Sequence, residues 1–191
     1  MKKLVILIMV VFGVYSYGVD FLTRDKIIKD KMVIMIGNEK REINIKRLIE
    51  MTQMMESSGG RNRYTGRVAK SSYQYEIATW DHYKRLPMVK DLYENISSMV
   101  GHKLDPLKEE DSKYITYILY YAKIFYHHKK IATSKFFNSD DIEWTIYKEL
   151  WNSSLGASTY AKWVERTSEY KAEMLIKGEI GLDSYNLICR M

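Results

Sequence analysis

One carboxylate in the sequence, that of Glu56, occupies a position from which it could act as an acid. Apolar residues recur at helical spacing from Ile45 to Met55, and the pair Gly59-Gly60 follows as a stop. Eleven residues at about 100° each bring Glu56 to within roughly 20° of Ile45 around the helix. Its carboxyl group therefore emerges on the apolar stripe, where it either caps or pairs locally or has a pKa raised by burial. A raised pKa is what a general acid at neutral pH requires.

Glycoside cleavage is a reaction that such an acid performs, and its common forms need a second carboxylate across the cleft. Glu76 and Asp81 are the candidates, although both could instead be solvated residues of a short helix. His127 and His128 are adjacent and point to different faces of a helix, which favours a helix-end charge over a metal site. The lone Cys189 excludes a disulfide framework and a cysteine-based metal cluster. We therefore expect no metal and no cofactor.

Tyrosine is the most over-represented aromatic residue, with 16 Tyr against 5 Phe and 4 Trp. An aromatic ring packs on the apolar face of a pyranose while its hydroxyl or N–H group reaches the sugar hydroxyls. Candidates for such sugar contacts lie near the proposed acid or in the later chain: Tyr64, Tyr73, Tyr75, Trp80, Tyr147 and Trp151. Core packing is expected instead for the aromatic residues of the regular helical stripes, namely Tyr114, Tyr121, Tyr126, Tyr160, Trp163 and Tyr170.

The elements that must position these residues are mostly helices. The 191 residues, of which 46% are hydrophobic and only 2 are Pro, are sized for a single globular domain with long helices. Periodicity predicts a helix that begins at residue 39 and stops before Gly59, and a central, largely apolar helix over 112–130. Residues 32–36 fit a short strand or an amphipathic arm, and residues 61–72 fit a loop or small hairpin. Further helices are predicted over 73–83, 88–100 and 158–177, and from a capping box at Asp140-Asp141-Ile142-Glu143 through Trp151.

The first 18 residues have the three-part layout of a secretory signal peptide. Lys2 and Lys3 precede an apolar run of about eleven residues, shorter than the roughly 20 that a spanning helix needs, and Ser16 and Gly18 follow. An uncleaved anchor or a buried helix is the alternative. Cleavage removes two lysines and lowers the formal net charge from +6 to +4. We expect an exported basic protein without a stable membrane span after cleavage, which would meet anionic envelope polymers or lipid headgroups rather than nucleic acid.

Three segments follow one another in a suggestive order: Glu56-Ser57-Ser58-Gly59-Gly60, then Ser71-Ser72-Tyr73-Gln74-Tyr75, then Ala78-Thr79-Trp80. They resemble the front half of the lysozyme-like (SLT-type) lytic transglycosylases. That family has a catalytic Glu followed by Ser at a helix end, a glycine-containing loop, a Gly-x-x-Gln element and then a Thr. The resemblance implies that Glu56 is the acid and base, that Ser57 supports it, and that Gln74 lies in the substrate cleft beside Tyr73 and Tyr75.

The segment from Tyr147 to Gly156 resembles the family's late Tyr-Asn-x-Gly element, which closes the cleft beside the Glu. Tyr147 and Asn152 are the residues that this second resemblance adds to the substrate-binding site. The sequence departs from the pattern at three positions. Ser71 stands where the family has glycine, Trp151 replaces the tyrosine before Asn152, and Gly156 follows that Asn by four residues rather than two.

The resemblance implies a mainly α, lysozyme-like α+β domain over residues 39–191, after a signal peptide (1–18) and an N-terminal arm (19–38). It implies a periplasmic or secreted enzyme that cuts the MurNAc–GlcNAc β-1,4 bond of peptidoglycan by a single-Glu, substrate-assisted mechanism. A hydrolytic muramidase with a second carboxylate is one alternative. A non-catalytic peptidoglycan-binding protein or an adaptor of an envelope-spanning assembly is the other.

Overall fold

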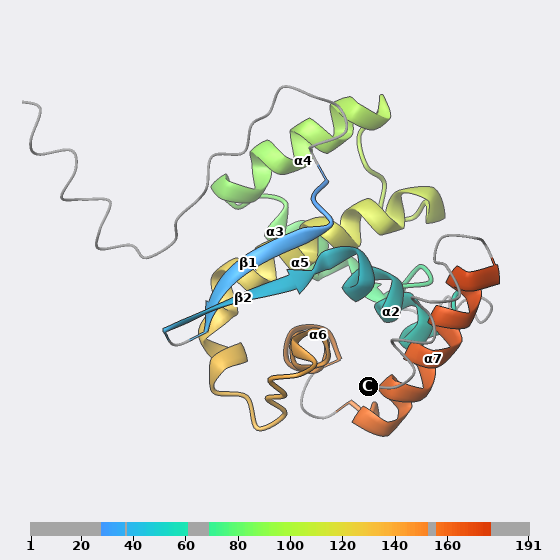
Figure 1. Cartoon of the computed structure of the whole chain (residues 1–191). Helices are drawn as coiled ribbons and strands as arrows, with labels where there is room; N and C mark the ends of the chain where they lie inside the picture. Colours follow the sequence, from blue (N-terminus) through green and yellow to red (C-terminus); the bar gives the residue numbers. More distant parts are fainter. Residues whose placement is uncertain (1–27, 37, 61–68, 153–155, 177–191) are drawn as a thin grey trace, which may run out of the picture.

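The structure, a computed structural model, describes residues 28–36, 38–60, 69–152 and 156–176 (Figure 1). Within these ranges the chain is mainly helical with two small antiparallel strand pairs, which confirms the prediction of a mainly α fold at that level. The predicted signal peptide, residues 19–27 of the arm, Tyr64 and Cys189 lie outside the described residues. In the described ranges, none of the helices combines the length and the apolar character that a bilayer span requires.

Among the described residues, two strand pairs flank the first helix, and the elements that follow them are helical. In order they are β1 (Lys31–Ile36), β2 (Glu39–Asn44), α2 (Ile45–Ser57), β3 (Ala69–Lys70), β4 (Tyr75–Glu76), α3 (Ile77–Tyr83), α4 (Pro87–Val100), α5 (Glu109–Ala132), α6 (Ile142–Ile146), the π-helix η2 (Tyr147–Trp151) and α7 (Tyr160–Ile176). The helices predicted over 88–100, 112–130 and 158–177 are confirmed as α4, α5 and α7.

β1 and β2 form an antiparallel hairpin in which Lys31 pairs with Asn44 and Ile36 with Glu39. The strand alternative for residues 32–36 is therefore confirmed, whereas the prediction that a helix begins at residue 39 is wrong. Pairing with β1 outweighs the helix-favouring composition of this charged stretch, because strand formation depends on the neighbouring strand more than on intrinsic preference. The helix begins at Ile45 instead, where the Asn44 side chain accepts a hydrogen bond from the Arg47 amide and caps it.

The described chain after α2 continues as the small strand pair of β3 and β4, so residues 75–76 are strand and not helix. Lys70 pairs with Tyr75, and the tight turn between them has left-handed backbone at Ser71 (φ 65°) and Gln74 (φ 57°). α3 therefore begins at Ile77, four residues later than predicted. A β segment after the helix that carries Glu56 agrees with the small hairpin expected there.

α5 is the central helix, as predicted from its apolar circumference. It contacts β1, α2, α3, α4, α6 and η2, and Figure 1 shows it passing behind the β1–β2 hairpin. Ile115, Ile118, Leu119 and Tyr120 are fully buried along it. The hydrophobic core thus surrounds α5. Helix α2, whose last turn carries Glu56, and η2 both pack against this helix.

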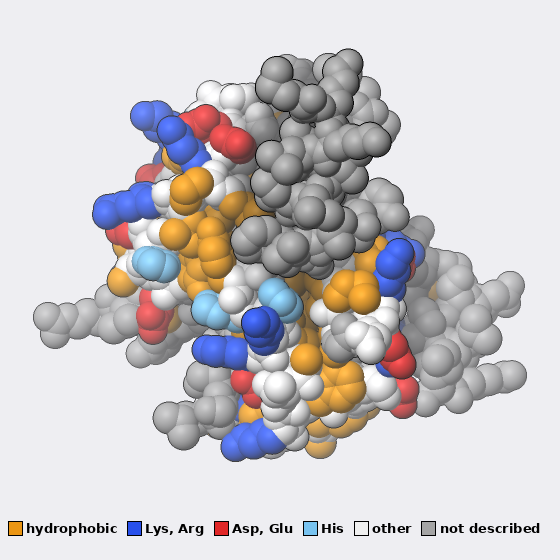
Figure 2. Space-filling model, turned by 90° about the vertical axis from the view of Figure 1, so that its left-hand side faces the viewer, with side chains coloured by type: hydrophobic (Ala, Val, Ile, Leu, Met, Phe, Trp, Pro, Cys, Tyr) orange, Lys and Arg blue, Asp and Glu red, His pale blue; other side chains and the backbone are white. Residues whose placement is uncertain are grey.

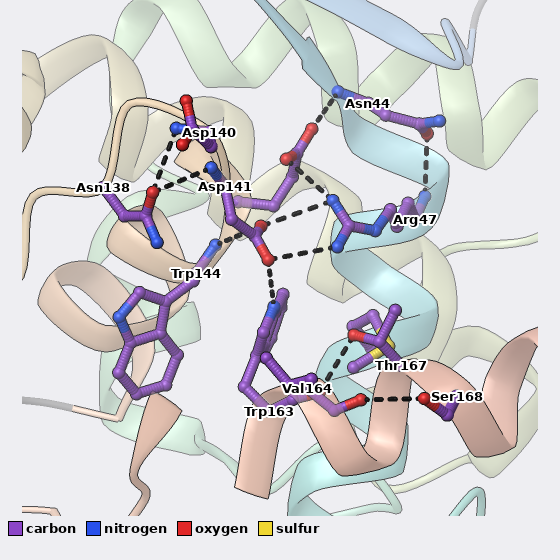
Figure 3. A network of polar contacts seen from close by, with 12 residues as sticks. Asn44, Arg47, Asn138, Asp140, Asp141, Trp144, Trp163, Val164, Thr167 and Ser168 are labelled. Carbon is purple, nitrogen blue, oxygen red and sulfur yellow. Dashed lines mark hydrogen bonds and ion pairs between the residues drawn. The ribbon is translucent and has the colours of Figure 1, made fainter. Parts of the chain in front are cut away.

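A polar network fixes the start of α2 against α6 and α7 (Figure 3). The Arg47 guanidinium donates to Asp141 Oδ2 at 3.2 Å and to Glu143 Oε2 at 3.0 Å. Trp163 Nε1 donates to Asp141 Oδ2 at 2.8 Å, and the Asn44 amide donates to Glu143 Oε1 at 2.8 Å. Asp141 alone caps α6 through the Trp144 amide. Glu143, the expected second member of the capping box, instead accepts hydrogen bonds from Arg47 and Asn44. The prediction of a capping box is therefore wrong for this residue.

Candidate active site

Glu56 lies in the last turn of α2 and is partly buried. Its Oε1 accepts a hydrogen bond of 2.8 Å from the Tyr147 hydroxyl, and the Asn152 side chain lies near enough to the carboxyl group to lower its pKa. Burial raises the pKa of Glu56, while the bond from Tyr147, the Asn152 side chain and the charge of Lys162 act in the opposite direction. The sequence prediction of an inward-pointing carboxyl group in the apolar stripe agrees with this position.

The π-helix η2 brings Tyr147 and Asn152 to the same carboxyl group. The backbone amide of Asn152 donates to the backbone carbonyl of Tyr147 at 2.9 Å, a bond that spans five residues. In an α-helix these two residues would be roughly 140° apart around the axis, because five residues turn it by about 500°. Short π-helical turns are frequent at functional sites. The two segments that the resemblance matched, at Glu56 and at Tyr147, thus meet in the structure.

The Tyr147 ring is fully buried and held by aromatic neighbours. It stacks on Trp163 with ring centroids 5.2 Å apart and lies 6.1 Å from the Trp144 ring. Its hydroxyl contacts Ser158 Oγ at 3.1 Å in addition to Glu56. Burial and the nearby Glu56 raise the pKa of Tyr147 far above the ordinary value of tyrosine, so the hydroxyl stays protonated and can donate.

Ser57 holds the end of α2 rather than pointing at the carboxyl group. It is buried, its hydroxyl donates to the Gln53 carbonyl at 3.0 Å, and it accepts from the Gly60 amide at 2.9 Å. Ser58 closes the helix in the left-handed conformation, with φ 54°. This agrees with a supporting role for Ser57, in which it fixes the turn directly after the Glu56 position.

The turn between β3 and β4 is tied to α2 and α5. Gln53 Nε2 donates to Ser72 Oγ at 2.8 Å, and the Ser72 amide and hydroxyl both donate to Glu109. Gln74 is partly buried, and its Nε2 donates to the Ser71 carbonyl at 3.2 Å. Ser71 has the left-handed φ that glycine adopts without steric cost, so the departure from the family's glycine brings local strain.

Tyr73 and Tyr75, expected to face a sugar, lie in the core with exposed fractions of 7% and 3%. The Tyr75 hydroxyl donates to the Pro106 carbonyl at 3.0 Å, and the Tyr73 carbonyl accepts from Trp151 Nε1 at 3.0 Å. Trp80 is buried as well. All three rings belong to the hydrophobic core, so they present little surface to a sugar.

Several tyrosines that were expected in the core are instead at the surface. Tyr126 and Tyr160 are exposed by 42% and 40%, so the core prediction is wrong for both, whereas it is confirmed for the fully buried Trp163. Tyr114, Tyr121 and Tyr170 are partly buried. Helical spacing indicates which face of a helix a ring occupies, but not how far neighbouring elements cover that face.

The two candidate second carboxylates have local partners on α3. Glu76 is exposed and accepts from Thr79 Oγ1 at 3.3 Å. Asp81 forms an ion pair of 2.6 Å with Lys84, and the hydrogen bond from that lysine lowers the Asp81 pKa. Among the described residues, the groups that act on the Glu56 carboxyl group are Tyr147, Asn152 and Lys162, and neither candidate carboxylate is one of them.

Figure 2 shows one face of the molecule, on which hydrophobic side chains gather in several patches beside histidine and lysine or arginine side chains. Of the two adjacent histidines, His127 contacts the Tyr83 hydroxyl through Nε2 at 2.9 Å, and His128 Nδ1 lies 3.1 Å from the Phe125 carbonyl. The described residues contain no group of three or more His, Cys, Asp or Glu side chains that could hold a metal ion.

Sequence reasoning missed Lys148 and Ser158. Lys148 is buried and its ammonium group donates to Asn152 Oδ1, while Ser158 contacts the Tyr147 hydroxyl. Ser158 carried no distinguishing pattern, and a lysine within a helix ordinarily indicates a solvated face. The departure of the late element from the family's spacing was the one signal that pointed to an unusual arrangement here.

The arrangement around Glu56 can perform acid and then base chemistry. A partly buried carboxyl group with a raised pKa can give up a proton, and two neutral donors, Tyr147 and Asn152, can then stabilise the carboxylate. No family model matches the sequence, and no curated protein and no solved structure matches the chain. The case for a function therefore depends on the side chains around Glu56.

Proposed function

We propose that the protein is an exported lytic transglycosylase that cleaves the MurNAc–GlcNAc β-1,4 bond of peptidoglycan with Glu56 as acid and base. The observation that carries the proposal is the environment of this carboxyl group. It is partly buried, its pKa is raised, it accepts a hydrogen bond from Tyr147, and Asn152 lies near enough to lower its pKa; the resemblance assigns these two residues to the same cleft. No second carboxylate is needed in the family's mechanism.

In the proposed reaction, protonated Glu56 first donates its proton to the bridging oxygen. The bond between that oxygen and the anomeric carbon breaks, and the carbonyl oxygen of the muramic 2-acetamido group bonds to the anomeric carbon. The Glu56 carboxylate then removes the proton of the 6-hydroxyl group, whose oxygen displaces the acetamido oxygen and closes a 1,6-anhydro ring. Glu56 ends protonated, as it began. Tyr147 and Asn152 stabilise the carboxylate between the two proton transfers.

The positions of Glu76 and Asp81 support this single-carboxylate route over a hydrolytic muramidase. A hydrolase of the common type needs a second carboxylate held across the cleft from the acid. Glu76 contacts Thr79 of α3, and Asp81 contacts Lys84, which directly follows that helix. Replacement of either carboxylate should therefore leave the cleavage of peptidoglycan essentially unchanged.

The purified protein incubated with peptidoglycan sacculi tests the proposal. We expect anhydromuropeptides among the released products, and we expect Glu56→Gln to lower the rate of release by about 10²-fold or more. Glu76→Gln and Asp81→Asn are the matched controls, because each removes a carboxylate charge from an exposed or ion-paired position. Circular dichroism of each variant checks that the fold is retained.

The other outcomes each assign a different role. Products with reducing ends, together with activity lost in Glu76→Gln or Asp81→Asn, would identify a muramidase. Binding to sacculi without release of fragments would indicate a peptidoglycan-binding module, and the absence of binding would favour an adaptor of an envelope assembly. An unimpaired Glu56→Gln variant would remove this residue from the mechanism.

A further inference from the structure

Lys148 is a buried cation held by neutral oxygen atoms. The side chain is 3% exposed, and its Nζ donates to Asn152 Oδ1 at 3.0 Å and to the Gly156 carbonyl at 2.6 Å. The ring of Phe136 lies 5.3 Å from the same nitrogen. Burying an ammonium group is costly unless its donors are satisfied, so these contacts define where the group can sit. A lysine of an ordinary solvated helix face would be exposed at this position, whereas Lys148 is buried.

The chemistry of the ammonium group decides which way the Asn152 amide faces. An ammonium group has donors and no acceptor, so the atom of Asn152 that meets Lys148 must be the oxygen. The amide nitrogen of the same side chain then points away from Lys148. The Asn152 side chain also lowers the pKa of Glu56 and that of Tyr147, as a donor facing them does, and only its nitrogen is able to donate. Without a fixed partner, the side chain of an asparagine can turn so that either its oxygen or its nitrogen faces a given neighbour.

Gly156 packs so closely against Asn152 that position 156 has no room for a larger residue. A Cβ atom at position 156 would lie 2.1 Å from Asn152 Oδ1 and 2.3 Å from the Asn152 carbonyl oxygen. Its φ lies outside the left-handed region that favours glycine, so the reason for a glycine here is contact and not backbone conformation. The carbonyl of the same residue accepts from Lys148. Gly156 and Lys148 thus hold Asn152 from two directions.

We propose that Lys148 is a positioning residue of the site, which holds the Asn152 side chain with its amide nitrogen toward Glu56. Asn152 then stabilises the carboxylate form of Glu56 and does not compete with it for a proton. Its relevance to cleavage rests on the function proposed above, whereas the orientation itself does not. Loss of Lys148 frees the amide to turn, and a carbonyl oxygen facing Glu56 would favour the protonated acid instead.

The direct test is the pKa of Glu56, measured by carbon-13 NMR of its carboxyl group in the full chain. We expect Lys148→Met to raise this pKa by roughly one unit through loss of a hydrogen bond to the charged form. Lys123→Met is the matched control, because Lys123 Nζ donates to the Leu150 carbonyl of the same π-helix at 2.7 Å. It should leave the Glu56 pKa unchanged, although it disturbs η2 as much.

Removing a positive charge would itself raise the pKa of a nearby acid, and a double-mutant cycle separates the two causes. The charged or titratable groups that face Glu56, namely Tyr147 of η2, Tyr120 of α5 and Lys162 of α7, stay in place throughout. We expect the effect of Lys148→Met to vanish in the Asn152→Ala background. A shift of equal size in both backgrounds would show that Lys148 acts by charge alone, and the positioning proposal would be wrong.

A measurement on the unaltered protein decides the matter if Lys148→Met does not fold. The nitrogen-15 and proton resonances of the Asn152 side-chain amide should shift together with the titration of Glu56, because that amide donates to it. Resonances that do not follow Glu56 would overturn the proposal. None of these measurements needs substrate, so a protein that fails to cleave peptidoglycan contradicts the proposed function and leaves the orientation of Asn152 to be judged separately.

Discussion

The two ends of helix α2 lie in different polar environments. Each of them joins the helix to the segment formed by α6 and η2. At its start, the guanidinium group of Arg47 meets the carboxylates of Asp141 and Glu143, so opposite charges are placed together. At its end, the carboxyl group of Glu56 accepts from the neutral hydroxyl of Tyr147 and lies beside the neutral side chain of Asn152. The same pair of segments is therefore joined by ion pairs at one end and by neutral groups around an acid at the other.

This difference indicates a division of tasks along one helix. Removal of one partner from a partly buried group of matched charges is costly, because it leaves the others uncompensated. A partly buried carboxyl group whose hydrogen-bonding neighbours are neutral has a pKa raised by burial and binds a proton more readily. The first arrangement suits an anchor and the second suits an acid. The following substitutions test whether the two ends are independent in this way.

Arg47→Met should have the largest effect on stability. It leaves Asp141 and Glu143 without their cation, and we expect the free energy of unfolding to fall by about 3 kcal/mol. Arg41→Met is the matched control, because the Arg41–Glu39 pair of 2.7 Å lies at the surface and should contribute less than about 1 kcal/mol. Urea denaturation measures both. Equal effects of the two substitutions would contradict the idea of a buried anchor.

Gly156→Ala should disturb the Glu56 end with a smaller cost in stability. The added methyl group overlaps Asn152, and overpacking of this kind costs about 1–3 kcal/mol. We also expect cleavage activity to fall, because Asn152 is displaced from Glu56. Gly101→Ala is the control: its φ of 83° makes alanine strained there, and nothing lies within 4 Å of the added atom. That variant should lose stability, by about 1 kcal/mol, and keep its activity.

Glu56→Gln should act on stability in the opposite direction to Arg47→Met. The folded-state pKa of Glu56 is raised above its ordinary value of 4.5, so the native state holds its proton more tightly than the unfolded chain. The stability that this proton contributes is fully present below about pH 4.5 and is lost as the pH rises through the folded-state pKa. We therefore expect the variant to unfold at higher urea than the wild type at pH 8, with little difference at pH 4.

The exposed Glu76→Gln substitution is the control for this pH dependence, and its effect should stay within about 0.5 kcal/mol at both pH values. A Glu56→Gln variant that is less stable than the wild type at pH 8 would mean that the Glu56 end is an anchor like the Arg47 end. The contrast between the two ends of α2 would then be lost.

The parts of the fold that could be predicted from the sequence are those whose pattern is local. α4 and α5 follow from apolar periodicity and from the left-handed Gly101 that ends α4. β2 could not be predicted in this way, because its charged residues favour a helix and only pairing with β1 makes it a strand. α3 was predicted too long for a similar reason, since pairing of Tyr75 with Lys70 takes the first residues into a strand.

The candidate site divides along the same line. The inward direction of Glu56 follows from helical rotation alone, and Tyr147 and Asn152 follow from the resemblance. The role of Lys148 could not be predicted, because a helical wheel at 100° per residue does not bring both Tyr147 and Asn152, the residue that Lys148 contacts, to one carboxyl group. The π-helical register that does so depends on tertiary packing against α5. The aromatic candidates Tyr73 and Tyr75 show the converse, since their proximity in sequence said nothing of their burial.

Tyr147→Phe should have the smallest effect and is the most specific probe of the Glu56 end. It keeps the ring that stacks on Trp163 and removes only the hydroxyl that donates to Glu56. We expect a loss of about 1 kcal/mol in the free energy of unfolding. The hydrogen bond from Tyr147 lowers the Glu56 pKa, so its removal should raise that pKa further and move the alkaline limit of cleavage activity to higher pH. Tyr83→Phe, which removes a hydroxyl bonded to His127, should change neither the Glu56 pKa nor the alkaline limit of cleavage activity. If the Glu56 pKa fell in Tyr147→Phe, the hydroxyl would be an acceptor from Glu56, and the carboxylate would depend on Asn152 alone.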